Sequence, residues 1–338
     1  MEYGGPDLGY LAVTMDCLWD AYDATDDTRF LESARSALNF IFPFVQMPQL
    51  GAGMFNARNT DYIVPYGIAR FLHDEESRDT ATVILNRLFG NCSDPDHFLH
   101  AIDDRYFCHY IGHSIFRALP LLEKGTSIDV CETLNSEIYF DGTGQWLLPE
   151  TTSGCSAIIG AKKGGILSLH FGEESCSDFG WVAQVKGKEW VSHWWGDFWK
   201  IEREANSISI SGHLTPHTEN NSTPLKHIVL RGLSLVFGRK IIGILKEKMI
   251  FKERTGEGIP YTRKISFFDD TVEVSDTFDG IEGSQLKRAP RSSKRHVASA
   301  DSYHVEDVAL STNGITMLEE RKNDGSLLRI KTIYRSKA

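Results

Sequence analysis

Cysteine is scarce in this sequence, with six residues among 338. The six lie far apart and form no Cys-x-x-Cys pair, so we expect reduced thiols and no disulfide framework. No run of about 18 apolar residues occurs, which excludes a helix that spans a membrane. The first residues also lack a basic segment followed by an apolar one, so we expect no signal peptide and a cytoplasmic location.

Positive charge is the second deficit, because 36 Lys and Arg face 46 Asp and Glu and leave a formal net charge of −10. This balance argues against a general nucleic-acid binder. With 41% hydrophobic and 24% charged residues, the chain is otherwise typical of globular proteins, and its length suffices for two domains. We find no P-loop, Rossmann glycine pattern, nucleophile elbow or internal repeat.

The first part of the chain, residues 1–135, has the period of amphipathic helices. One apolar stripe covers 8–22, and a second covers 28–42, where Pro43 is expected to end the helix. Shorter helical stretches follow over 65–72, 78–89 and 104–122. The short connections between them predict antiparallel helix pairs.

In residues 136–338 the period changes to two, with Val- and Ile-rich segments separated by Gly, Asn and Asp. We expect strands over 164–171, 180–187, 207–212, 227–238, 240–251, 271–278 and 327–334. Many short antiparallel strands favour a β-sandwich, so the predicted fold is α+β with a helical domain followed by a large antiparallel β-sandwich domain. Five helices bury their apolar stripes poorly alone, which favours docking on the β part or on another copy of the chain.

Four segments in a fixed order carry a resemblance to a known family. They are YGGPDLGYLAVT (3–14), NARNTDYIVPYG (56–67), DDRYFCHY (103–110) and GAKKGGILSLHFGEESCSDFGW (160–181). In order and spacing they resemble the heparinase II/III-like proteins, which are polysaccharide lyases and their relatives. The resemblance covers most of the chain and implies an incomplete α/α toroid before the β-sandwich. Members usually have more helices upstream, so we expect a C-terminal fragment or a shortened member.

The resemblance implies β-elimination on an acidic polysaccharide. In this reaction a base removes the proton beside the uronate carboxylate, an acid protonates the leaving oxygen, and a third group offsets the carboxylate charge. Tyrosine can act as base and acid where neighbouring groups lower its pKa. Tyr10 matches the tyrosine of these lyases. The alternative is a packing residue with its hydroxyl at the rim of the toroid.

The segment 56–67 holds a second group of candidates. Arg58 offers a planar fork for a carboxylate, and Asn59 offers an uncharged donor. Tyr62 and Tyr66 could form the wall against which a sugar ring lies, although relatives often have histidine at Tyr66. The alternative is a structural loop in which Asp61 pairs with Arg58.

Two further pairs of residues allow two readings each. His227 and Arg231 are predicted on one face of a strand. The resemblance implies that His227 neutralises the uronate or acts as acid, whereas the alternative is an ordinary strand histidine. Asp103 and Asp104 are explained by helix capping and the helix dipole. Their alternative is a pair of acid/base carboxylates in a glycoside hydrolase.

Several relatives also hold a structural zinc. Asp178 matches their aspartate, but Ser177 stands where a histidine is common, and the spacing is not that of a compact zinc motif. We therefore expect no cofactor, with His170, Asp178 and His193 as weak metal candidates. A tryptophan cluster over 194–199 is interpreted as core, with a sugar-stacking platform as the alternative.

The sequence thus predicts a lyase that cleaves a uronate-containing polysaccharide. The catalytic candidates are Tyr10, Asn59 and His227, and the substrate-binding candidates are Arg58, Tyr62, Tyr66 and Arg231. Two alternatives stay open: a non-catalytic glycan-binding or polysaccharide-export accessory protein, and a glycoside hydrolase on the same scaffold. The expected partners are an acidic polysaccharide or oligosaccharide and a second copy of the chain, with no nucleic acid and no membrane.

Overall fold

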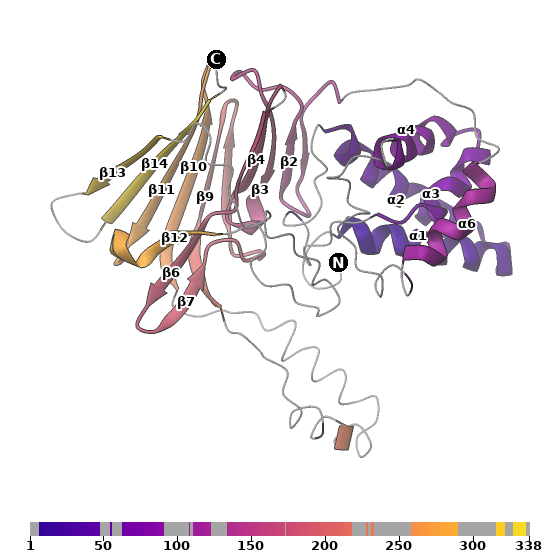
Figure 1. The fold of residues 1–338 in the computed structure, drawn as a ribbon, viewed down its shortest axis with the longest axis horizontal. Helices are drawn as coiled ribbons and strands as arrows, with labels where there is room; N and C mark the ends of the chain where they lie inside the picture. The colour runs from indigo at the N-terminus through magenta and orange to yellow at the C-terminus, as the bar shows by residue number, and fades with distance from the viewer. Residues whose placement is uncertain are drawn as a thin grey trace.

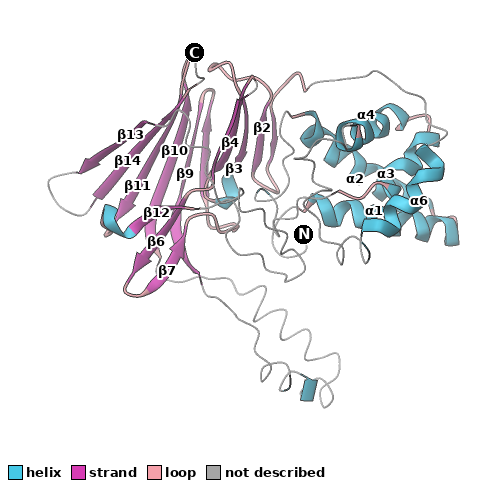
Figure 2. Ribbon diagram, viewed as in Figure 1, coloured by secondary structure: helices cyan, strands magenta, loops and turns pink. Residues whose placement is uncertain are grey.

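The computed structural model describes residues 7–47, 55, 63–90, 108, 111–122, 134–172, 174–217, 228, 231–232, 258–289, 316–321 and 327–335. The longer helices lie within 8–122 and the strands within 138–334, which confirms the predicted α+β class. The helices gather on one side of the molecule and the sheets on the other (Figures 1 and 2). None of the described helices combines the length and the apolar character that crossing a bilayer requires.

The described helical elements follow the predicted stripes. They are α1 (Leu8–Thr25), α2 (Thr28–Gln46), α3 (Tyr66–Ala69), which continues into the 3₁₀ turn η3 (Arg70–His73), α4 (Arg78–Phe89) and α6 (Gly112–Leu122). Aspartates cap the first two helices: Asp7 accepts the Tyr10 backbone N–H, and Asp27 accepts that of Arg29. Because only two residues join α1 to α2, the two helices pack against each other as the predicted hairpin.

The predicted end of the second helix at Pro43 is wrong, because α2 continues through this proline to Gln46. Proline lacks the N–H that would bond the preceding turn, and this normally breaks a helix. Phe44 and Val45, however, are both buried in the helical core. Their burial favours the continued helix and offsets the lost hydrogen bond.

A five-stranded antiparallel sheet forms the middle layer of the molecule. It contains β1 (Ile138–Phe140), β2 (Gln145–Leu148), β3 (Ser156–Gly160), β4 (Ile166–Phe171) and β5 (Glu174–Asp178), paired in chain order. Side chains alternate between the two faces of a strand. Leu147 and Ile158 therefore pack into the helical core, whereas their neighbours Trp146 and Ile159 pack into a second core. Both faces of this sheet are thus covered.

A nine-stranded antiparallel sheet closes the second core. Its strands are β6 (Trp181–Val185), β7 (Lys188–Val191), β8 (Lys200–Glu204), β9 (Ser207–His217), β10 (Ile259–Phe267), β11 (Val272–Asp279), β12 (Leu286–Arg288), β13 (Thr316–Arg321) and β14 (Leu327–Tyr334). They are ordered β12-β6-β7-β9-β10-β11-β14-β13, with β8 paired to β9. Five of the predicted strands are confirmed as β4, β6, β9, β11 and β14.

The strand predicted over 227–238 is wrong at the residues described there. Ile228, Arg231 and Gly232 have helical backbone geometry. Ile228 is 67% exposed, so it does not lie on a buried sheet face. A short apolar run fits a strand and a helix equally well, and periodicity alone cannot choose between them. His227 and the strand predicted over 240–251 lie outside the described residues.

Candidate functional site

Tyr10 lies in the first turn of α1, close to where the helices meet the middle sheet. The Asp7 carboxylate accepts its backbone N–H at 3.0 Å and so fixes the start of the helix. Leu8, fully buried, belongs to the same apolar cluster as Ile166 of β4 and Phe179 after β5. Tyr10 itself is half-buried, two residues after Leu8.

Lys163 lies at the same junction on the sheet side. It ends the 3₁₀ turn η6 (Ala161–Lys163), which joins β3 to β4, and it is only 6% exposed. Burial lowers the pKa of its ammonium group from the ordinary 10.5 to about 7, while the negative charge of Asp7 acts to raise it. Asp7 thus connects the first turn of α1 electrostatically with a lysine that titrates near neutral pH.

Tyr66 lies at the start of α3 between two guanidinium groups. The Arg117 guanidinium covers its ring at 3.6 Å, and Arg70 Nη1 donates to its hydroxyl at 3.1 Å. Each arginine also pairs with a carboxylate of α1, Arg117 with Asp20 and Arg70 with Asp23. Tyr66 is 7% exposed, which leaves little of the ring for the predicted contact with a sugar.

Asp16 of α1 is buried between α1, α3 and α6 and links these three helices. Its carboxylate accepts the Gly67 backbone N–H at 2.6 Å and a hydrogen bond from the Ser114 hydroxyl of α6. Burial raises the pKa of Asp16, and these hydrogen bonds oppose the rise. A side chain at position 67 would meet Met15 at 2.7 Å, so glycine is required for this close approach of α3 to α1. The cluster braces the helices that carry Tyr10 and Tyr66.

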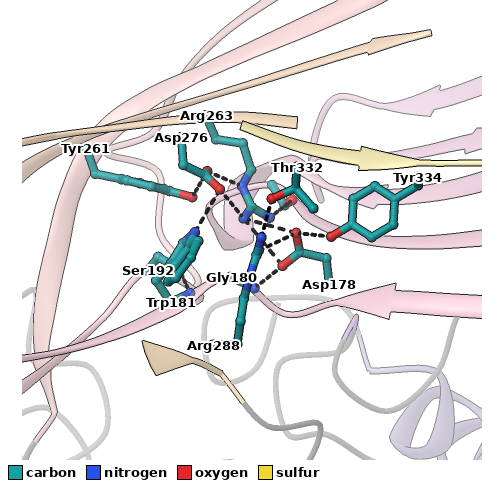
Figure 3. A network of polar contacts seen from close by, with 11 residues as sticks. Asp178, Gly180, Trp181, Ser192, Tyr261, Arg263, Asp276, Arg288, Thr332 and Tyr334 are labelled. Atoms are coloured by element: carbon teal, nitrogen blue, oxygen red, sulfur yellow. Dashed lines mark hydrogen bonds and ion pairs between the residues drawn. The ribbon is translucent and has the colours of Figure 1, made fainter. Parts of the chain in front are cut away.

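A buried network of charged groups lies between the two sheets (Figure 3). Arg263 is its centre and has no exposed surface. Its Nε donates to Asp276 Oδ1 at 2.7 Å, its Nη2 to Asp276 Oδ2 at 3.0 Å, and its Nη1 to the Gly165 carbonyl at 3.0 Å. The same guanidinium lies 3.3 Å from Asp178 Oδ2. One arginine therefore neutralises two buried carboxylates on different strands.

The remaining members of the network satisfy these carboxylates. Tyr334 donates to Asp178 at 2.8 Å, and Arg288 Nη1 donates to the same oxygen at 2.8 Å. Tyr261 and the Trp181 indole each donate to Asp276 at 2.7 Å. Burial disfavours the charge on Asp178, but Arg263 and Arg288 outweigh this effect and hold its pKa below the ordinary value. Saturated in this way, the network is structural and ties strands of the two sheets to each other.

The described residues do not bring the weak metal candidates together. On β4, Leu167 pairs with Asp178, and His170 lies three residues farther along, so the His170 and Asp178 side chains point to opposite faces of the sheet. The Asp178 carboxylate is also fully engaged by arginine and tyrosine. Within the described ranges no three His, Cys, Asp or Glu side chains group as a metal site, and His193 is no exception.

The other predicted site residues have mixed outcomes. Arg231 is described and exposed on a helical turn. Asn59, Arg58, Tyr62 and His227 lie outside the described residues, so their predicted roles stay predictions. The same holds for Asp61, Asp103 and Asp104.

Sequence reasoning missed Lys163, Arg263 and Asp276. For the last two a signal existed: each is a charged residue at an inward position of a strand whose other inward positions are apolar. For Lys163 no such signal exists, because it lies in a turn and not in a strand with a regular inward pattern. Comparison with protein-family models, with curated proteins and with solved structures finds no match to this chain.

The stability of the protein is expected to rise with pH because of Lys163. Between pH 7 and 10.5 the unfolded chain binds one more proton at this residue than the folded chain. The free energy of unfolding then rises by up to about 1.4 kcal/mol per pH unit in this range. Denaturant unfolding from pH 7 to 10 should show this slope in the wild type and a smaller one in Lys163→Met. Lys162→Met, the neighbouring control, should keep the wild-type slope, and equal slopes in all three proteins would contradict the burial of Lys163.

Proposed function

We propose that the protein is a heparinase II/III-like polysaccharide lyase that cleaves a uronate-containing polysaccharide by β-elimination. In this proposal the helices form the incomplete α/α toroid, and the two sheets form the β-sandwich. The observation that carries it is Asp7, which accepts the Tyr10 backbone N–H at the start of α1 and also acts electrostatically on the buried Lys163. The four-segment resemblance supports the substrate class.

Tyr10 lies at the N-terminal end of α1. The first turn of a helix carries partial positive charge, which favours negative charge on groups nearby. The buried Lys163 ammonium adds a full positive charge when it is protonated. A phenolate must form if tyrosine is to take a proton from the sugar. The helix end and Lys163 favour this negative charge, whereas the Asp7 carboxylate at the Tyr10 backbone opposes it.

Lys163 also suits the proton balance of an elimination. Its pKa of about 7 means that the protonated and neutral forms coexist at neutral pH. In the protonated form it offsets the charge that develops beside the uronate carboxylate, and in the neutral form it can accept a proton from tyrosine. We propose Tyr10 as base and acid, with Lys163 as its electrostatic partner.

The test is the ultraviolet absorbance of the unsaturated uronate that elimination creates. The full chain is mixed with heparin, heparan sulfate, chondroitin sulfate, hyaluronan, alginate and polygalacturonate. We expect absorbance to rise with at least one of them, and Tyr10→Phe to lose at least about 100-fold in rate. Tyr22→Phe, a half-buried tyrosine of the same helix, is the matched control and should retain the rate.

Two outcomes would sink the proposal. One is a flat trace over the whole panel from a protein shown to be folded, which would favour a non-catalytic glycan-binding protein if the same polysaccharides still bind. The other is cleavage that yields only saturated products and survives Tyr10→Phe, as expected for a glycoside hydrolase.

A further inference from the structure

The segment between β7 and β8, residues 192–199, is a loop held in one conformation by its own hydrogen bonds. Gly196 donates its N–H to the Lys162 carbonyl at 2.9 Å, and the Trp199 indole donates to the Trp194 carbonyl at 3.0 Å. Trp199 is buried in the core between the sheets and anchors the end of the loop. These contacts hold the loop against the turn that carries Lys162.

Phe198 is the exposed aromatic residue of this loop. Its ring stacks on His213 of β9, with centroids 4.4 Å apart and planes at 26°, and lies 4.8 Å from the Trp199 ring. A side chain at Gly196 would meet the Phe198 ring at 2.3 Å, so the ring lies directly over this glycine. Phe198 is nevertheless 36% exposed. A preordered, partly exposed aromatic ring is suited to stack against the apolar face of a sugar.

Lys162 places a positive charge beside the same loop. Its Nζ lies 2.6 Å from Asp197 Oδ1, 3.1 Å from the Gly142 carbonyl and 5.9 Å from the centroid of the Trp195 ring. Asp197 is an exposed residue, with a side chain 73% accessible to water. The Lys162 side chain is 19% exposed, so the anion must displace the exposed Asp197 to pair with the ammonium group.

Two ring nitrogens at this loop have unmet hydrogen-bonding capacity. Trp195 Nε1 and His213 Nε2 are buried, and neither has a hydrogen-bond partner in the part of the chain that the structure describes. A buried polar group that stays unpaired lowers the stability of the fold.

We infer that the loop 192–199 and Lys162 form a saccharide-binding subsite for an acidic sugar residue. Phe198 stacks on the sugar ring, and Lys162 pairs with its carboxylate or sulfate. Lys162 of the subsite and Lys163 are neighbours in the turn η6. The inference rests on the proposed function for its ligand class, because an acidic polysaccharide spans several subsites.

The test measures binding without turnover, in the Tyr10→Phe protein. The probes are a heparin hexasaccharide, an oligogalacturonate hexamer and a neutral hexamer of N-acetylglucosamine, each titrated by calorimetry. We expect Phe198→Ala to weaken binding of an acidic probe about tenfold, and Lys162→Met to weaken it similarly while sparing any binding of the neutral probe. Thermal melts establish that each variant is folded.

Matched controls come from exposed residues of the same kind elsewhere on the β part. Phe268, 50% exposed after β10, and Lys200, paired with Glu202 on β8, are changed to Ala and Met. Both controls should keep the affinity. Unchanged affinity in folded Phe198→Ala and Lys162→Met, or no binding of either acidic probe, would overturn the subsite.

The outcomes separate this inference from the proposed function. Unsaturated product from the wild type, with an unchanged KM in Phe198→Ala, overturns the subsite and leaves the lyase standing. Binding that depends on Phe198 and Lys162, in a protein that forms no unsaturated product, supports the subsite and overturns the lyase.

Discussion

Arg263→Met is expected to lower the free energy of unfolding by about 3–5 kcal/mol, the loss typical of breaking a buried ion pair from one side. The variant leaves the carboxylates of Asp178 and Asp276 between the sheets without their shared cation. Methionine fills most of the volume, so the loss reports charge and hydrogen bonding more than a cavity. Urea unfolding, followed by tryptophan fluorescence, measures it.

The matched control is an ion pair of the same sheet that faces solvent. Lys331 of β14 pairs with Glu273 of β11, and its side chain is 41% exposed. Lys331→Met should cost no more than about 1 kcal/mol. If Arg263→Met lowered the free energy of unfolding no more than this control does, the network of Figure 3 would not be a buried structural element. If Arg263→Met fails to fold, Arg263→Lys keeps one positive charge and should recover folded protein of intermediate stability.

Gly164→Ala is expected to destabilise the protein by at least about 3 kcal/mol, because two penalties combine at this position. The backbone has φ of +65°, a conformation that L-residues with a side chain avoid. A methyl group there would also lie 2.0 Å from the Ser192 carbonyl oxygen and 3.1 Å from the Trp199 ring. Neither neighbour can move without disturbing the loop 192–199.

Gly154 is the control that separates the two penalties. It has the same φ of +65°, and nothing lies within 4 Å of the position that a methyl group would occupy. Gly154→Ala should therefore cost only about 1 kcal/mol from backbone strain. The difference between the two variants, read from denaturant midpoints, is the steric part. Equal losses would mean that the turn after Lys163 does not contact the loop.

The regular elements could be predicted from the sequence where one period dominates. Helix 78–89 and strand 327–334 have the predicted bounds, because each apolar stripe ends at a polar or turn-forming residue. Pro43 misled the prediction because local sterics were weighed without the burial of the residues that follow it. The apolar run after 227 misled it because its side chains need not face a core.

Candidate site residues could be predicted from the sequence only where the residue type itself suggests a chemical role, as for a tyrosine that could act as base. Tyr10 is chosen from the resemblance to the lyase family, and its catalytic role stays a prediction. Lys163 could not be predicted, since its lowered pKa depends on packing between segments about 150 residues apart. Arg263 and Asp276 are 13 residues apart in sequence and become neighbours only through the register of β10 and β11.

The middle sheet has a consequence for how the chain is made. Helices α1 to α6 leave the ribosome before the strands that cover them, since synthesis proceeds from the N-terminus. Until β2, β3 and β4 are made, the helices lack Leu147, Ile158 and Ile166, which complete their core. The nascent helical segment therefore exposes apolar surface during this interval, when chaperones can bind it. Adding the middle sheet buries that surface, and the sheet's other face then becomes the template for the second core.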